Sequence, residues 1–99
     1  MKKSGAVYIL TNQNNTTLYT GVTSDLKRRI NAHKEKTDTR SFTARYYLNK
    51  FVYYEGFRRI EDAIFREKQI KAGSKAKKEK LINSINPEWK DLYDEVLLW

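Results

Sequence analysis

The feature that most constrains the fold of this chain is a pair of short apolar segments on either side of an asparagine-rich stretch. Residues 6–10 and 18–22 are both rich in β-branched and aromatic side chains, which favour strands. Between them lies Asn12-Gln13-Asn14-Asn15, a composition typical of turns. Two strands joined in this way predict an antiparallel hairpin, with Tyr8 and Tyr19 near each other across the pair.

A helix is predicted immediately after the hairpin. Ser24 has a side chain that caps helices well, and the charge of Asp25 suits a first turn. The helix should run from Asp25 to about Glu35. Leu26 and Ile30 are four residues apart, and this spacing marks the face that packs on the core.

The second half of the chain predicts one more strand and further helices. Polar residues 36–45 indicate a loop, and a third strand lies within residues 46–57, best defined at Phe51-Val52-Tyr53-Tyr54-Glu55 and closed by Gly56. A second helix is predicted from about Ile60 to Ala72, and Gly73 ends it. Ser74 caps a third helix, which reaches Ile85. The tail from Trp89 is expected to fold back over the core as a helix or short strand. The expected class is α/β (α+β), with a small three-stranded antiparallel sheet flanked by helices in the order β-β-α-β-α-α plus a C-terminal cover.

Length and charge limit the functions that this chain can have. Its 99 residues contain no linker, so a single domain over residues 1–99 is expected. The absence of cysteine excludes disulfides, thiolate metal sites and thiol nucleophiles, and it fits a reducing cytoplasm. No apolar run reaches the roughly 18–20 residues of a membrane span. A net charge of +8 favours an anionic partner, nucleic acid before an acidic membrane surface, although a merely soluble basic protein stays an alternative.

Glu67 has the most informative position in the sequence. On the predicted second helix, Ile60, Ala63 and Ile64 define an inward stripe, and Glu67 follows at the centre of that face. A carboxylate there costs several kcal/mol of desolvation unless a cation compensates it. Two interpretations are equally good: a ligand for a hard divalent cation such as Mg²⁺, or a salt bridge to a neighbouring arginine.

Arg29 and His33 form a second candidate group. They are four residues apart on the first helix and share a face that borders the Leu26/Ile30 stripe. A guanidinium at the edge of a core suits bidentate phosphate binding, and His33, the only histidine, can exchange a proton near neutral pH. Taken singly, each is better explained as an ordinary surface charge or half-buried polar residue.

Tyr8 and Tyr19, taken by themselves, are best interpreted as core residues of the hairpin. A phenol ordinarily has a pKa of about 10, so a tyrosine acting as a general base near pH 7 needs a cation or metal beside it.

Basic residues cluster in two further places. Such groups can follow a phosphate backbone without recognising its sequence, and a solvated polar surface is an equal alternative for each residue alone. One group borders the long loop and the other surrounds the end of the second helix and the third helix: Lys34, Lys36, Arg40 and Arg45, and then Lys71, Lys75, Lys77, Lys78 and Lys80.

As a set, these residues resemble the GIY-YIG nuclease superfamily, and more closely its small stand-alone bacterial proteins. Ala6-Val7-Tyr8 stands for the first triplet, and Tyr19-Thr20-Gly21 for the second, eleven residues later from tyrosine to tyrosine. Arg29 follows the second tyrosine by ten residues, where the family has its catalytic arginine, and His33 and Glu67 match the next active-site position and the metal-binding glutamate. The resemblance covers a core of residues 5–87, leaving 88–99 as a C-terminal extension.

The resemblance implies hydrolysis of DNA phosphodiester bonds with one divalent ion, Mg²⁺ or Mn²⁺, held by Glu67. It implies that Tyr19 helps to deprotonate the attacking water with Tyr8 hydrogen-bonding nearby. Arg29 would stabilise the extra negative charge on phosphorus, and His33 would assist proton transfer or orient the site. The family often has a late active-site asparagine, for which Asn83 and Asn86 are both candidates.

Two departures from the family pattern stand out. Ala6 replaces the first glycine of the first triplet, and Val22 occupies the position at which some relatives have a lysine. The leading hypothesis is a DNA endonuclease, acting on branched, damaged or single-stranded DNA and taking specificity from a homodimer or a protein partner. The alternatives are a catalytically weak or inactive nucleic-acid-binding module, and a basic adaptor whose apolar tail docks a protein.

Overall fold

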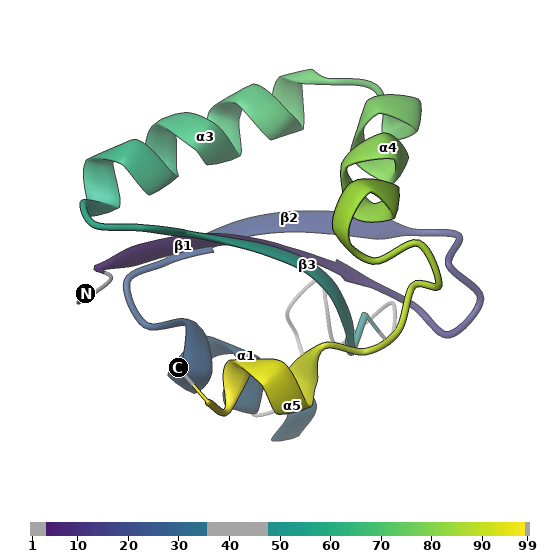
Figure 1. Ribbon diagram of the computed structural model, residues 1–99, viewed down its shortest axis with the longest axis horizontal. Helices are drawn as coiled ribbons and strands as arrows, with labels where there is room; N and C mark the ends of the chain where they lie inside the picture. Colours follow the sequence, from purple (N-terminus) through teal and green to yellow (C-terminus); the bar gives the residue numbers. More distant parts are fainter. Residues whose placement is uncertain (1–3, 36–47, 99) are drawn as a thin grey trace.

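The computed structural model describes residues 4–35 and 48–98, without the side chains of residues 33–35 (Figure 1). Three strands come from two parts of the chain: β1 (Gly5–Thr11), β2 (Leu18–Thr23) and β3 (Lys50–Phe57). The helices in the described residues are α1 (Leu26–Glu35), α3 (Ile60–Ala72), α4 (Lys75–Ile85) and the short α5 (Tyr93–Val96). This order and the antiparallel sheet confirm the predicted fold class, with α5 as the C-terminal cover.

The sheet has the order β2-β1-β3, so β1 is the central strand and β2 lies at one edge. In the β1–β2 hairpin Tyr8 pairs with Gly21 and Leu10 with Tyr19. Asn12 shapes the turn, because its Oδ1 accepts hydrogen bonds from the backbone N–H groups of Thr16 and Thr17 at 2.8 and 3.2 Å. The asparagine-rich segment is therefore the predicted turn.

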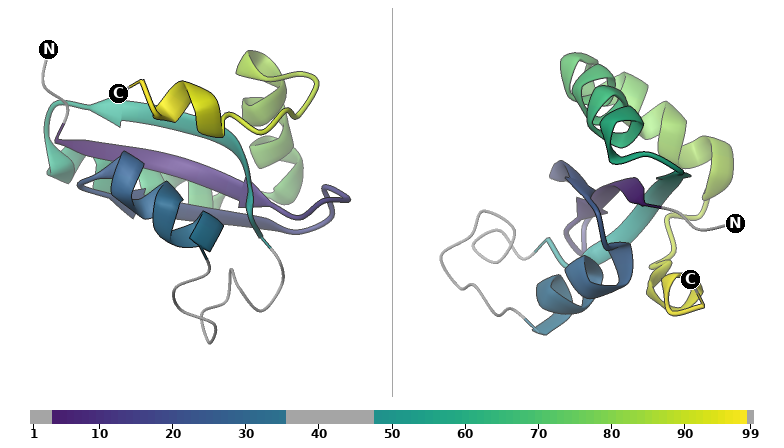
Figure 2. Two further views of the ribbon diagram at one scale, coloured as in Figure 1. Left: turned by 90° about the horizontal axis from the view of Figure 1, so that it is seen from below. Right: turned by 90° about the vertical axis from the view of Figure 1, so that its left-hand side faces the viewer.

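Each face of the sheet carries its own apolar core, because successive residues of β1 point to opposite sides. Tyr8 and Leu10 pack with α1 and α5 on one face. Val7 and Ile9 pack with α3 and α4 on the other, so the helices form two layers around the sheet (Figures 1 and 2).

Two details at the helices differ from the predictions. Asp25, and not Ser24, caps α1, since Asp25 Oδ1 accepts a hydrogen bond from the N–H of Arg28 at 3.1 Å and the helix begins at Leu26. On α3, Ile64 is 39% exposed, so it does not belong to the inward stripe. The predicted bounds of α3 and the Ser74 cap of α4 are confirmed; Ser74 Oγ accepts from the N–H of Lys77 at 3.2 Å.

The C-terminal tail is held to β3 by backbone and side-chain hydrogen bonds. The N–H of Leu92 donates to the carbonyl of Phe51 at 2.7 Å, and Asp91 Oδ1 accepts from the N–H of Phe51 at 3.2 Å. Leu92 and Val96 are buried in the core beneath α1, and α5 lies beside α1 (Figure 2). The tail therefore completes the core on the face that carries Tyr8. Within the described part of the chain, no helix is long and apolar enough to cross a membrane.

Asn86 connects α4 to β3 and to the tail. It is buried, and its Nδ2 donates to the carbonyls of Val52 and Lys90 at 3.0 and 2.8 Å, while its Oδ1 accepts from the N–H of Lys90 at 3.0 Å. Its side-chain amide therefore makes two donated hydrogen bonds and one accepted hydrogen bond, all of them with backbone groups.

We expect Asn86→Ala to lower the free energy of unfolding by about 2–4 kcal/mol, because buried backbone groups of Val52 and Lys90 lose their partner. Asn83→Ala is the matched control: its exposed side chain accepts one hydrogen bond, from Trp89 Nε1 at 2.6 Å, so a loss of about 1 kcal/mol or less is expected. Urea denaturation of both variants measures the difference. Equal losses would contradict the structural role given to Asn86.

Candidate active site

The centre of the candidate site is a contact between Tyr8 and Arg29. Tyr8 lies on the central strand and is fully buried, whereas Arg29 is exposed on α1 next to the buried Ile30. The Nε–H of Arg29 donates a hydrogen bond to the hydroxyl oxygen of Tyr8 at 3.0 Å. This bond helps to fix the orientation of the guanidinium, and a side-chain hydrogen bond to Tyr19 also contributes to the raised pKa of Arg29.

Gly21 is what allows Tyr8 to reach the edge of the sheet. A Cβ atom built on Gly21 would lie 2.4 Å from both Cζ and the hydroxyl oxygen of Tyr8, so the phenol lies directly against the backbone of β2. Tyr19, two residues earlier on β2, has its ring centroid 6.5 Å from that of Tyr8, which confirms that the tyrosines are neighbours. The hydroxyl end of Tyr8 is thus delivered to the edge strand.

Gly21→Ala is expected to destabilise the protein by about 1–3 kcal/mol, because Tyr8 or the backbone of β2 must move to admit the new methyl group. Gly73→Ala is a matched control, since its Cβ would lie 3.3 Å from its closest neighbour, the carbonyl oxygen of Ile70, and a change within about 1 kcal/mol is expected. The cost of Gly21→Ala should largely disappear in a Tyr8→Ala background. If chemical denaturation shows the same cost in both backgrounds, the clash with Tyr8 is not its cause.

The protonation of Tyr8 follows from its surroundings. Burial raises the pKa of Tyr8, the hydrogen bond and the charge of Arg29 lower it, and the charges of Tyr19 and Glu67 raise it further, so that the net shift is upward. The phenol therefore keeps its proton at neutral pH. The pKa of Arg29 is also raised, chiefly by its hydrogen bond to Tyr8. The pair thus consists of a neutral phenol and a permanent cation.

Glu67 approaches this site from the other face of the sheet. It lies on the inward side of α3 with Ala63 and Ile70, as the sequence predicts, and its side chain is only 13% exposed. The partner of its carboxylate is Lys71, one helical turn later, whose Nζ lies 2.8 Å from Glu67 Oε2. The sequence offered a salt bridge from Glu67 to a neighbouring arginine as one alternative, and the structure shows a salt bridge to Lys71. The charge of Glu67 is the smallest of the influences on the pKa of Tyr8, and it raises that pKa.

The donor set suits a cation that keeps most of its water. No group of three or more His, Cys, Asp and Glu side chains gathers in the described residues, so a site built wholly from protein ligands is not found there. Glu67 is a sheltered carboxylate with one lysine partner, and Mg²⁺ commonly binds through one or two carboxylates together with several waters and the phosphates of a substrate. The residues present fit such an ion.

The other predicted site residues fall into three groups. The backbones of His33 and Lys34 belong to α1, but their side chains lie outside the described residues, as do Lys36, Arg40 and Arg45 altogether. Asn83 and Asn86 make the structural hydrogen bonds described above. The remaining lysines lie at the junction of α3 and α4. Lys71 forms the salt bridge to Glu67, and Lys75 Nζ donates a hydrogen bond to the carbonyl of Thr16 at 2.7 Å. Lys77 and Lys78 line the groove between the two helices.

Sequence reasoning did not identify the part that Gly21 plays. In the sequence, Gly21 stands out only as a member of the second triplet. A glycine inside a strand does often mark a place where another group lies close to the backbone. What the sequence did not show was that the approaching group is Tyr8, because this depends on the pairing of Tyr8 with Gly21.

Comparison with known proteins gives one family and one solved structure. The family model described as the GIY-YIG catalytic domain matches residues 4–80. The chain is also similar to a UPF0213 protein from Bacillus halodurans, known from a solution NMR structure. The two are 29% identical, the match covers 88% of this chain and 90% of the other, and the TM-score is 0.56. No curated protein matches the chain.

Proposed function

Since the chain belongs to the GIY-YIG catalytic domain family, we propose that it is a metal-dependent endonuclease that hydrolyses DNA phosphodiester bonds. The observation that most supports this is the hydrogen bond of Arg29 to a buried Tyr8, beside Tyr19 and within the electrostatic influence of Glu67. A cation, two phenols and a sheltered carboxylate are the groups that phosphoryl chemistry needs.

Arg29 is proposed to stabilise the negative charge that develops on the phosphate. Its five N–H donors form a rigid planar fork, which is oriented by the bond of Nε to Tyr8 and by a hydrogen bond to Tyr19. The remaining donors can bind phosphate oxygens, an interaction that strengthens as charge accumulates in the transition state. The permanent charge of the guanidinium makes this contribution independent of pH in the neutral range.

Tyr8 and Tyr19 are proposed to handle the attacking water. Tyr8 accepts the bond from Arg29 and is proposed to hydrogen-bond close to the attacking water. Tyr19, half-buried on the edge strand, is proposed to help deprotonate that water. His33 is proposed to assist proton transfer from the same helix face as Arg29.

Glu67 is proposed to hold one Mg²⁺ or Mn²⁺ ion. When bound, such an ion supplies Lewis-acid stabilisation and lowers the pKa of coordinated water. Lys71 keeps the carboxylate paired through the 2.8 Å contact of its Nζ, which limits the cost of sheltering the charge. Lys71 and Lys75 are proposed to contact the DNA backbone, and the net charge of +8 favours that partner.

The proposal is tested by incubating the protein with single-stranded, duplex and branched DNA in Mg²⁺, in Mn²⁺ and in chelator. We expect cleavage of at least one substrate with either metal and none in chelator. Salt-dependent binding without cleavage in any metal would favour an inactive binding module of the same fold. The absence of salt-dependent DNA binding would favour the basic adaptor, with specificity for a protein partner.

A further inference from the structure

A groove with a volume of about 500 Å³ lies between α3 and α4. Both helices cover the sheet face opposite to α1, so the groove is on the other side of the sheet from Arg29 (Figure 1). Its volume falls within the range of small-molecule sites. It is lined by apolar side chains at depth and by polar and charged ones around them, chiefly Ile70, Leu81, Arg66, Gln69, Lys77 and Lys80.

The groove is strongly cationic. Arg66, Lys77, Lys78 and Lys80 all line it, and no carboxylate does. Among the ion pairs of the described residues, one neutralises Arg66 and none involves the three lysines. Three uncompensated charges around an apolar floor repel one another and favour an anionic occupant.

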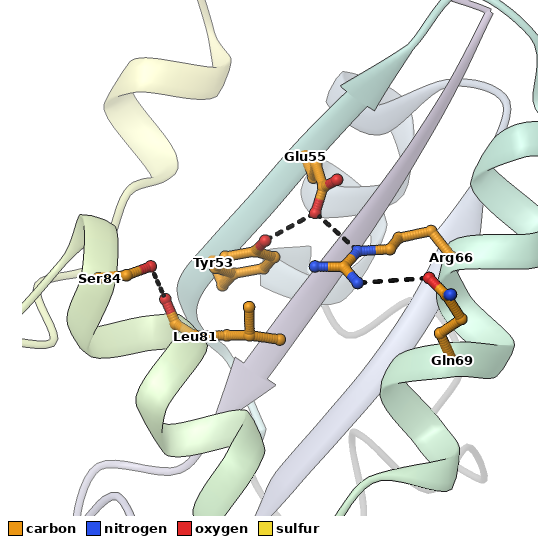
Figure 3. A network of polar contacts seen from close by, with 6 residues as sticks. All are labelled: Tyr53, Glu55, Arg66, Gln69, Leu81 and Ser84. Carbon is orange, nitrogen blue, oxygen red and sulfur yellow. Dashed lines mark hydrogen bonds and ion pairs between the residues drawn. The ribbon is translucent and has the colours of Figure 1, made fainter.

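Arg66 is held in place by a network of polar contacts (Figure 3). Its Nε donates to Glu55 Oε2 at 3.1 Å and its Nη1 to Gln69 Oε1 at 3.3 Å, while the hydroxyl of Tyr53 donates to the same Glu55 oxygen at 2.7 Å. Burial, and then Glu55, raises the pKa of Tyr53 to about 12, so this donor persists at all ordinary pH values. Because the guanidinium has five N–H donors, its fixed orientation leaves donors for a further acceptor.

The apolar part of the groove favours a polyanion that has exposed apolar faces, such as a nucleic-acid strand with unpaired bases. Ile70 is buried and Leu81 half-buried, and both border the space between the helices. One turn before Gln69 on α3, Phe65 is 64% exposed, although it is not itself part of the groove lining. In a duplex the flat faces of the bases are stacked inside, whereas an unpaired base can contact apolar and aromatic side chains while its phosphates meet lysines.

We propose that the groove between α3 and α4 binds single-stranded nucleic acid, with phosphates on Lys77, Lys78 and Lys80 and an unpaired base over the apolar floor. The proposal rests on the proposed function only in taking nucleic acid as the partner. It requires no cleavage, and it places this contact on the opposite face from Arg29. A strand held there while another segment occupies the Tyr8–Arg29 site gives preference to substrates that have an unpaired tail.

Binding of short oligothymidylate, oligouridylate and a blunt duplex is measured in chelator by fluorescence anisotropy, with the full chain and with Lys77→Gln/Lys80→Gln. Glutamine is nearly as good a helix former as lysine, so α4 should be retained. We expect a loss of about tenfold in affinity for single strands and a shallower salt dependence, by about 0.7 in logarithmic slope for each phosphate contact removed. Lys68→Gln/Lys90→Gln removes the same charge from exposed positions outside the groove and should change the affinity little.

Three outcomes would overturn the proposal: equal losses in the two double variants, an equal loss of affinity for the duplex, or thymidine monophosphate binding as tightly as the oligonucleotide. A stronger effect on oligothymidylate than on oligouridylate identifies DNA as the natural strand, and the reverse identifies RNA. Amide NMR shifts locate the contact without any substitution. Shifts confined to the surroundings of Tyr8 and Arg29 would refute binding in the groove and leave the proposed nuclease activity intact. Shifts in the groove of a protein that cleaves no substrate would support binding in the groove and refute the nuclease activity.

Discussion

Replacing Glu67 with glutamine is expected to lower kcat for DNA cleavage by about a thousandfold or more, equivalent to about 4 kcal/mol of transition-state stabilisation. Glutamine keeps the shape of the side chain on the inward face of α3, but it removes the negative charge that would hold the metal ion. Because Mg²⁺ favours anionic oxygen ligands, the metal concentration needed for half-maximal activity should also rise. Single-turnover cleavage over a series of Mg²⁺ concentrations measures both effects.

Stability separates a lost metal ligand from a damaged fold. The pair of Glu67 with Lys71 is an i,i+4 contact on a helix, so its loss should cost only a few tenths of a kcal/mol. Glu61→Gln is the matched control, since Glu61 lies on the same helix with its side chain 65% exposed beside Arg59. It should leave cleavage unchanged. If Glu67→Gln keeps wild-type activity, or if both variants lose it equally, Glu67 is not the metal-binding carboxylate.

The second large effect is expected from Arg29→Lys, which should lower kcat by about 10²–10³-fold with a smaller change in KM. Lysine keeps the positive charge, but it lacks the planar fork that binds two phosphate oxygens and it cannot reproduce the bond from Nε to Tyr8. The loss therefore falls on the transition state more than on substrate binding. Steady-state kinetics on one defined oligonucleotide separates kcat from KM.

Ultraviolet spectroscopy of a second variant, Arg29→Ala, gives an independent measurement of the contact with Tyr8. Arg29 lowers the pKa of Tyr8 through its hydrogen bond and charge, against the larger effect of burial. Replacing it with alanine should therefore raise the pKa of Tyr8 further, which ultraviolet titration of tyrosinate detects at alkaline pH when compared with a Tyr8→Phe variant. Arg28→Lys, on the exposed neighbouring position, should change neither activity nor titration. A large kinetic loss in Arg28→Lys would show that charge density, and not geometry at Arg29, governs cleavage.

Much of the fold follows from local patterns in the sequence. The hairpin was predictable because turn residues separate two strand-forming segments, and α3 because Gly73 and Ser74 interrupt the helical pattern after Ala72. The cap of α1 was misplaced by one residue, since Ser24 and Asp25 are both good caps and only the backbone geometry selects Asp25. The exposure of Ile64 was also missed, because the width of the inward stripe on α3 depends on how that helix crosses the sheet.

The candidate site was less predictable than the fold. Spacing along the chain brought Tyr8, Tyr19, Arg29 and Glu67 together only as a resemblance to a family. Their arrangement depends on strand pairing and on which face each helix covers, since Arg29 lies on α1 at one face of the sheet and Glu67 on α3 at the other. Spacing alone also does not reveal that Asn86, a candidate for the late active-site asparagine, forms hydrogen bonds with the backbone of Val52 and Lys90.

The position of β2 at the edge of the sheet has a consequence for how this protein behaves at high concentration. An edge strand presents unpaired backbone groups that can recruit a strand from another molecule, and charged side chains around such an edge discourage that association. Arg29 is one such charge, because its Nε bonds to the Tyr8 hydroxyl that lies against Gly21 of β2. A substitution that removes this charge, such as Arg29→Ala, thus removes part of the protection against aggregation. Light scattering should therefore be measured together with the activity of that variant.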